Sequence, residues 1–256
     1  MIPLVLVGAA GRMGHAIEQA VGASTGFAIK ARVDRGAPGS GGPGWCADAA
    51  QVLAAGDVAV DFSAPAVTAA LAALCAGRGA ALVSGTTGLD AKEEEAVRAA
   101  AQKVPVVRAA NFSLGIAALR RALEAALGAL PSAWDIEIVE RHHRGKADSP
   151  SGTALLLAAR AASSRGADES ALRFGRGRGR TGPRPEGEIG VHALRGGTWV
   201  GDHLALIAGP GEWLELRHVA QARSAFAFGA LAAARFVSRA RPGFYGLDDV
   251  LAGGES

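Results

Sequence analysis

Cysteines, aromatic side chains and long apolar runs are all scarce in this chain of 256 residues, and each shortage excludes a class of protein. Cys46 and Cys75 are the only cysteines and form no CxxC pair, which excludes a disulfide-rich scaffold and favours a reducing compartment. No stretch approaches the roughly 20 apolar residues that a membrane span needs, and residues 1–14 lack the basic start of a secretory signal. We therefore expect a cytoplasmic protein with no membrane partner.

The shortage of aromatic residues also argues against a nucleic-acid partner. They make up 5% of the chain and are not interleaved with its basic residues, so the stacking surfaces of single-strand binders are missing. The formal net charge is only +3, and we interpret the arginine-rich segment 176–184 as a solvated loop. Small anionic ligands are therefore favoured over nucleic acid.

The first part of the chain alternates short apolar runs with alanine-rich amphipathic stretches. The runs at 57–62 and 80–84 are apolar on both faces, as parallel strands are when helices cover both sides of their sheet. This alternation is typical of βαβ units. It predicts an α/β nucleotide-binding domain with a parallel sheet over residues 1–112.

Capping residues predict where two helices of this domain begin and end. Pro65 suits the first position of a helix, and we expect Gly77 to end that helix. Asp90 and Glu93 have the spacing of a capping box, which predicts a helix over residues 91–103.

The pattern changes after Asn111, where a second domain is expected over residues 113–223. It begins with a helical stretch at 114–130, and its later β-like runs are separated by Gly-Gly and Gly-Pro-Gly turns, which suggests an antiparallel or mixed sheet. We therefore expect an α+β domain here. The last segment, 224–256, is expected to pack back on the first domain.

A glycine-rich turn follows the first apolar run. Gly8, Gly11 and Gly14 lie between an expected strand and an expected helix, where glycines let a pyrophosphate approach the helix N-terminus. Asp34 ends the next expected strand about 20 residues later, where a carboxylate would hydrogen-bond a ribose hydroxyl. Arg35 is either an exposed loop arginine or a partner for a 2′-phosphate, so we expect NADH, NADPH or both as cofactor.

Two further loops follow expected strands of the parallel sheet, at the edge where ligands of such sheets collect. They are Gly85-Thr86-Thr87-Gly88 and Ala110-Asn111-Phe112-Ser113. Either loop alone is more often a simple turn than a binding site.

The segment from Glu140 to Thr153 has the richest chemistry. Its expected helix would have Ser149 as N-cap and Pro150 as first residue, leaving the N–H groups that follow to face a carboxylate. Just upstream, imidazole, guanidinium and ammonium groups share one short loop, and their repulsion favours a bound dianion over the alternative of an exposed polar loop. Histidine is also the natural proton donor or acceptor near neutral pH.

Motifs that are missing narrow the chemistry. No Gly-Lys-Ser/Thr occurs, so a P-loop is excluded, and Tyr245 has no lysine four residues on, as short-chain dehydrogenases require. The adjacent histidines His142 and His143 lack zinc-ligand spacing, and neither cysteine is placed as a partner, so we expect no metal.

Taken in order, the segments GAAGRMG, VDFSAP, SGTTG, AANFSLG, ERHHRGKADSPSGTAL, EIGVHALRGG and GDH resemble bacterial dihydrodipicolinate reductases, also called 4-hydroxy-tetrahydrodipicolinate reductases, of lysine and diaminopimelate biosynthesis. The resemblance covers nearly the whole chain. It implies a Rossmann-type domain, a substrate domain whose sheet assembles a homotetramer, and reduction of a cyclic dicarboxylate by NADH or NADPH.

The resemblance also implies roles for individual residues. His142 matches the family's catalytic acid/base and Lys146 its proton donor, while His143, Gly152 and Thr153 match positions that hold the substrate. The positions that match cofactor contacts are Gly8, Ala9, Ala10, Gly11, Arg12, Met13, Asp34, Arg35, Gly85, Thr86, Thr87, Ala109, Ala110, Asn111 and Phe112.

Three other functions stay open on the sequence alone. One is a different NAD(P)-dependent oxidoreductase that acts on aspartate or on an amino-acid semialdehyde, although such reactions do not call for the cationic cluster at residues 142–146. Another is a non-catalytic NAD(H) sensor, which would need neither His142 nor Lys146. The third is a nucleic-acid binder that uses its arginine-rich segment and would show strong salt dependence.

Overall fold

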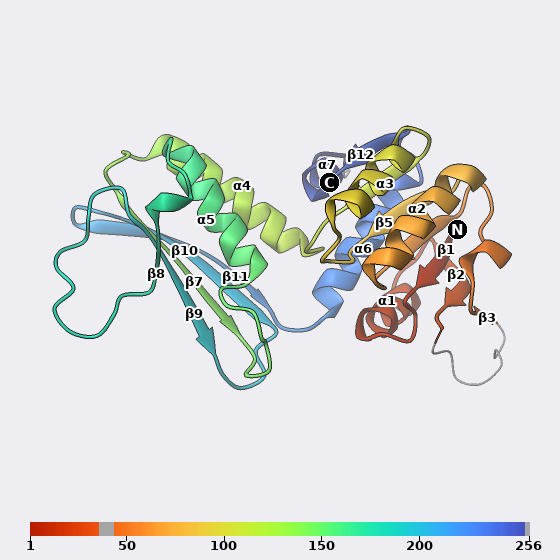
Figure 1. The fold of residues 1–256 in the computed structure, drawn as a ribbon, viewed down its shortest axis with the longest axis horizontal. Coiled ribbons are helices and arrows are strands. Elements are labelled where there is room, and N and C mark those ends of the chain that lie inside the picture. Colours follow the sequence, from red (N-terminus) through yellow and green to blue (C-terminus); the bar gives the residue numbers. More distant parts are fainter. Residues whose placement is uncertain (36–43, 254–256) are drawn as a thin grey trace. The chain divides into compact units, whose positions relative to one another are not determined.

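The computed structural model describes residues 1–35 and 44–253, and the chain divides into two compact units. The first unit comprises Met1–Leu114 and Arg223–Ser256, and the second comprises Gly115–Ala222 (Figure 1). The last three residues of the expected segment 224–256 lie outside the described residues.

The first unit is built on a parallel sheet of seven strands in the order β12-β6-β5-β4-β1-β2-β3. The chain crosses from one side of β1 to the other, as in a Rossmann-type sheet, so the predicted α/β class is confirmed. The strands are β1 Ile2–Val7, β2 Phe27–Val33, β3 Trp45–Cys46, β4 Val58–Asp61, β5 Ala81–Ser84, β6 Pro105–Arg108 and β12 Gly243–Tyr245.

Helices pack against this sheet and against each other. Helix α2 contacts α3, and α1 contacts α6, which also lies against β4, β5 and β6. The core contains the fully buried Val5, Ala59 and Leu82 of three adjacent strands. The helical elements are α1 Arg12–Gly22, the short 3-10 helix η1 Ala49–Gln51, α2 Pro65–Arg78, α3 Ala91–Ala101, α6 Ser224–Val237 and α7 Leu247–Gly253.

The helix ends agree with the local signals in two cases and differ in one. Pro65 begins α2, and Asp90 and Glu93 form the predicted capping box of α3. The prediction that Gly77 ends α2 is wrong. The helix continues to Arg78, and Gly79 takes the left-handed C-cap conformation with φ of 70°. A glycine is favoured in that conformation because it has no Cβ.

The second unit has a mixed sheet of five strands in the order β11-β10-β7-β9-β8. Strand β9 is parallel to β7 and β8, whereas β10 is antiparallel to β7 and β11, which confirms the mixed sheet predicted for this part. The strands are β7 Asp135–His142, β8 Leu172–Phe174, β9 Ile189–Arg195, β10 Gly201–Gly209 and β11 Glu212–Ala220.

One face of this sheet carries the core of the second unit. Helices α4 Leu114–Ala129 and α5 Gly152–Ser164 cover it, and a short 3-10 helix, η2 Glu169–Ala171, follows α5 (Figure 1). Leu123 of α4 and Leu157 of α5 pack with Ile138 of β7, and all three side chains are fully buried. Residues 115–129 thus cover the same strand that leads into the chemically rich segment.

Two predictions for that segment are wrong. His142 is the last residue of β7 and is buried, not part of a polar loop, because Gly196 donates its N–H to the His142 carbonyl at 3.1 Å and extends the ladder with β9. Helix α5 begins at Gly152 with Ser151 as N-cap, so Ser149 and Pro150 are not its first residues. The Ser151 hydroxyl accepts the Ala154 N–H at 3.2 Å, which fixes the start of the helix there.

Among the residues that the structure describes, no helix is both long enough and apolar enough to cross a membrane.

Candidate active site

The glycine turn of the first unit connects β1 to α1. Gly8 has φ of +78°, and a Cβ there would lie 2.6 Å from the carbonyl oxygen of Phe62. Gly11 donates its N–H to the Gly8 carbonyl at 3.0 Å and is the N-cap of α1, while a Cβ at Gly14 would collide with the backbone of Ala9. The backbone around this turn is therefore packed so closely that only glycine fits at Gly8 and Gly14.

A cavity of about 920 Å³ opens beside this turn. Gly8 and Gly11 line it together with Asp34, Arg35 and Phe62. The Asp34 carboxylate accepts the Ala10 N–H at 3.0 Å, so its position at the end of β2 is fixed. A glycine turn at a helix N-terminus fits the pyrophosphate of a nicotinamide dinucleotide, and a nearby carboxylate fits its ribose.

Asp61, at the end of β4, holds one of the two other predicted cofactor loops in place. Its carboxylate is fully buried and accepts hydrogen bonds from the hydroxyls of Thr68 at 2.7 Å, Ser84 at 2.9 Å and Thr86 at 3.0 Å. Both the N–H and the hydroxyl of Ser63 donate to it as well, at 3.1 and 2.5 Å. Sequence reasoning missed Asp61, although an acidic residue that closes an apolar strand in the VDFSAP segment was the available signal.

The remaining cofactor candidates lie in or beside these loops. A Cβ at Gly85 would collide with the ring of Phe62, and Arg108 donates to the Thr86 carbonyl at 2.7 Å. The buried ring of Phe112 lies edge-on to that of Phe62, with centroids 5.5 Å apart, so Phe112 can offer a ligand only its backbone. The other candidates here are the exposed Thr87 and Ala110 and the partly buried Ala109 and Asn111.

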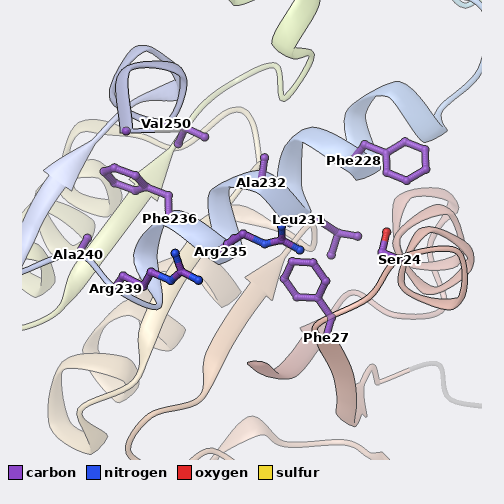
Figure 2. A pocket seen from close by; sticks show the side chains of 11 residues that line it. Ser24, Phe27, Phe228, Leu231, Ala232, Arg235, Phe236, Arg239, Ala240 and Val250 are labelled. Atoms are coloured by element: carbon purple, nitrogen blue, oxygen red, sulfur yellow. The ribbon is translucent and has the colours of Figure 1, made fainter. Parts of the chain in front are cut away.

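A second cavity of the first unit, of about 680 Å³, contains none of the predicted site residues. Helix α6 contributes more of its lining residues than any other element, and Phe27 closes one side (Figure 2). The Arg235 guanidinium lies 5.1 Å from the centroid of the Phe27 ring and donates to the Thr25 carbonyl at 3.1 Å. This arginine already has partners within the protein, and the predicted cofactor residues line the cavity beside the glycine turn instead.

In the second unit the candidate catalytic residue His142 is held by a buried acid. Its Nδ1 atom lies 2.5 Å from Oε2 of Glu140, a side chain with no exposed surface. Arg195 of β9 donates to both carboxylate oxygens of Glu140 at 2.8 Å. Burial alone would raise the pKa of Glu140, but the hydrogen bonds from Arg195 and His142 outweigh it, so the pKa lies below its ordinary value.

The loop after His142 carries the other candidates. The Lys146 ammonium pairs with the Asp148 carboxylate at 2.9 and 3.0 Å, which lowers the pKa of Asp148, and the Lys146 N–H donates to the His143 carbonyl at 3.1 Å. Gly152 is exposed at the start of α5 and Thr153 follows it, partly buried. The predicted catalytic and substrate residues are thus all on β7, its loop and the first turn of α5.

The expected repulsion among these basic groups is partly relieved by the chain itself. Glu140 neutralises the environment of His142, and Asp148 neutralises Lys146. The charge argument for a bound dianion is therefore weaker than the sequence suggested. The argument from the helix start no longer includes Ser151, whose N–H donates to Glu140 at 2.9 Å, and now depends on the exposed Gly152 and the residue after it.

A second histidine lies against His142. The rings of His142 and His203 have centroids 5.2 Å apart, and Nε2 of His203 is 3.1 Å from the Ser151 hydroxyl. Burial, with a smaller contribution from the charge of His142, lowers the pKa of His203 to about 4. His203 is therefore neutral at pH 7 and supports the N-cap of α5.

We expect this buried histidine to make stability depend on pH. Protonation of His203 favours the unfolded state, whose histidine has a pKa near 6.5, so its contribution is complete above about pH 6.5 and is lost as the pH falls to about 4. The loss amounts to about 3 kcal/mol over that range. Urea unfolding at several pH values should show a shallower pH dependence for His203→Gln than for the unmodified protein.

The matched control for this experiment is His15→Gln, which changes an exposed histidine on α1. Its unfolding free energy should follow that of the unmodified protein at every pH. Equal pH slopes for the two variants would show that His203 is not the group responsible.

A parallel sheet of this order, with a glycine turn after its central first strand, is the architecture of dinucleotide-binding dehydrogenases. Comparison with known proteins defines the family. The family model described as "Dihydrodipicolinate reductase, N-terminus" matches residues 2–112, and "Dihydrodipicolinate reductase, C-terminus" matches residues 115–251. The chain therefore belongs to the dihydrodipicolinate reductase family, as its sequence motifs predicted.

Curated relatives match this chain over nearly their whole length. The chain is 42% identical to the 4-hydroxy-tetrahydrodipicolinate reductase of Rhizobium meliloti, with 97% of this chain and 96% of that protein covered. It is also 42% identical to the enzyme of the same name from Caulobacter vibrioides, with 98% and 97% covered. Among solved structures, dipicolinate-bound dihydrodipicolinate reductase from Paenisporosarcina sp. TG-14 has the same fold, with a TM-score of 0.79 at 22% identity over 96% of this chain and 97% of that chain.

Proposed function

We propose that this chain reduces 4-hydroxy-tetrahydrodipicolinate to tetrahydrodipicolinate with a nicotinamide dinucleotide, and that β7, its loop and the start of α5 hold the substrate. The reductase activity, predicted from the sequence, is confirmed by the curated relatives that are named 4-hydroxy-tetrahydrodipicolinate reductase. The observation that supports the assignment of the site is the buried Glu140–His142 pair. Glu140 also accepts the N–H of Ser151, the N-cap of α5, so an imidazole suited to proton transfer is linked to a helix start suited to an anion.

The substrate of this reaction is a cyclic dicarboxylate, and the second unit offers groups suited to it. We propose that one carboxylate is bound at the first turn of α5 by Gly152 and Thr153, where the helix dipole favours an anion. His143, the first residue of the loop between β7 and α5, contributes a further polar contact. The solved relative from Paenisporosarcina contains dipicolinate, a compound of the same dicarboxylate type.

The bound dinucleotide supplies the hydride, and the chain must supply the proton. We propose that His142 gives a proton from Nε2 to the ring carbon next to the one that is reduced, since its Nδ1 is occupied by Glu140. Lys146 is the alternative donor. The positive charge of Lys146 also helps to stabilise the enamine-like negative charge that develops on the ring.

A comparison of substrates tests this function. Oxidation of NADPH, followed by absorbance, should occur with freshly generated 4-hydroxy-tetrahydrodipicolinate and not with aspartate or aspartate semialdehyde alone. Turnover of either of the latter would favour a different dehydrogenase. No turnover of any of the three would favour a non-catalytic sensor.

We propose that both NADH and NADPH bind beside the glycine turn. Asp34 and Arg35 lie next to each other at the lining of the cavity, so a carboxylate is available for a ribose hydroxyl and a guanidinium for a 2′-phosphate. The other contacts proposed are those of the turn residues Gly8–Met13 and of the loops at 85–87 and 109–112.

For Arg35→Ala we expect the affinity for NADPH to fall about tenfold, because one charge-assisted hydrogen bond to the 2′-phosphate is lost. The affinity for NADH, which lacks this phosphate, should change little. Fluorescence titration of each cofactor measures both values. Arg239→Ala, which removes an exposed arginine at the second cavity, is the control and should leave both affinities unchanged. An unchanged NADPH affinity in Arg35→Ala would remove the proposed role.

We further propose a homotetramer, assembled through the sheet of the second unit, that works in the cytoplasm. Edge strand β11 supports the first part, because Trp213, Leu214 and Val219 on it are exposed apolar side chains. Two free cysteines, Cys46 and the buried Cys75, support a reducing location.

A further inference from the structure

Glu140 has a complete set of hydrogen-bond partners although it is fully buried. Oε2 receives His142 Nδ1 at 2.5 Å and Arg195 at 2.8 Å, and Oε1 receives Arg195 at 2.8 Å and the Ser151 N–H at 2.9 Å. A carboxylate has about four lone-pair sites, so each oxygen is saturated by two donors. All four contacts require the ionised form, because a protonated oxygen would face a donor.

The ionised carboxylate determines the chemistry of the His142 ring. Glu140 can only accept, so the hydrogen between the two side chains must be on Nδ1 of His142. When the ring is neutral, Nε2 then has the free lone pair, and Nε2 is the nitrogen that takes and gives protons. The neighbouring position is a glycine, Gly201, and this leaves room at Nε2, because a Cβ there would lie only 3.3 Å from that nitrogen and would crowd it.

The same carboxylate joins three separate segments of the second unit. His142 is at the end of β7, Arg195 is at the end of β9, and Ser151 is the N-cap of α5. Arg195 also donates to the Asp148 carbonyl at 2.7 Å, which ties down the loop that carries Lys146. The position of the imidazole and that of the helix start are therefore set by one group.

We propose that Glu140, held by Arg195, is a positioning residue for the reduction: it fixes the tautomer and direction of the His142 ring and aligns that ring with the anion-binding start of α5. This inference rests on the proposed function, because that function gives the His142 imidazole its proton-transfer role. Glu140 itself does not touch the substrate.

The first test needs no substrate. Nitrogen-15 NMR of the ring nitrogens of His142 in the intact protein, at a pH where the imidazole is neutral, should show the tautomer with hydrogen on Nδ1. A neutral His142 with its hydrogen on Nε2 would overturn the proposal, whatever the behaviour of any variant.

The second test removes the charge of Glu140. In Glu140→Gln the amide NH₂ must face a donor, so we expect a mixture of His142 tautomers and a kcat at least tenfold lower, with unchanged NADPH affinity. Glu140→Asp keeps a carboxylate and should recover the Nδ1–H tautomer and part of kcat. A merely structural role would change stability in both variants without altering the tautomer.

Glu137→Gln is the matched control. Glu137 is on the same strand and accepts from His192 at 2.7 Å and from Arg184, so this variant removes a carboxylate with the same kinds of partner elsewhere on β7. It should keep the His142 tautomer and kcat within about twofold. Wild-type kcat and tautomer in Glu140→Gln would overturn the proposal. Failure of the unmodified protein to reduce the substrate would instead contradict the proposed function, since the NMR result does not depend on turnover.

Discussion

His142→Ala and Lys146→Ala should each lower kcat by about 10²- to 10⁴-fold, the usual contribution of a positioned general acid or base. The affinity for NADH should change little, because the cofactor contacts proposed above are in the first unit. Steady-state kinetics with 4-hydroxy-tetrahydrodipicolinate gives kcat, and a fluorescence titration gives the NADH affinity. Comparison of the two variants also identifies the main proton donor, which should show the larger loss.

The control for these variants is His192→Ala. His192 also pairs with a glutamate of β7, at 2.7 Å from Glu137, but it is on β9 and outside the candidate site. Its kcat should stay within about twofold of the unmodified protein. Near-normal turnover in both His142→Ala and Lys146→Ala would refute their roles.

Gly8→Ala should weaken cofactor binding roughly 100-fold, which corresponds to about 2.7 kcal/mol. The methyl group would lie 2.6 Å from the Phe62 carbonyl oxygen, so the turn must move away from Phe62 and shift the start of α1. The N–H groups that face the pyrophosphate move with it, and each charge-assisted hydrogen bond contributes about 1.5–3 kcal/mol. Titration with NADPH measures the loss, and circular dichroism checks that the variant is folded.

Gly56→Ala separates this effect from simple backbone strain. Gly56 has φ of +83°, close to that of Gly8, but nothing lies within 4 Å of a Cβ at this position. Both variants therefore lose about 1–2 kcal/mol of stability from the left-handed conformation, while only Gly8→Ala should lose cofactor affinity. Similar NADPH affinities in the two variants would show that the close packing at Gly8 has no role in binding.

Local signals were sufficient for much of the fold. Pro65 and the Asp90–Glu93 capping box act within one helical turn, so the helix starts they predict are observed. Runs that are apolar on both faces likewise predicted the parallel sheet, and glycine-rich turns between β-like runs predicted the mixed sheet. The short strand β12, Gly243–Tyr245, has no such pattern, since it pairs only with β6 at the edge of the sheet.

The parts that sequence reasoning missed depend on partners far along the chain. Arg195 and Glu140 are 55 positions apart, so no spacing rule connects them. The start of α5 was misplaced for the same reason, because the N–H of Ser151 is taken by Glu140, 11 positions earlier. Residue types in the motif predicted which chemistry is present, whereas the hydrogen bonds that orient it exist only in the folded unit.

The buried carboxylate of Asp61 has a consequence for the energetics of ligand binding. All of its partners are neutral donors, and they come from the end of β4, from α2 and from the strand and loop at Ser84 and Thr86. These segments are therefore immobilised during folding, before any dinucleotide arrives. The conformational entropy of this edge of the sheet is lost once, in the folding reaction, and so it is not subtracted from the affinity for each incoming cofactor molecule.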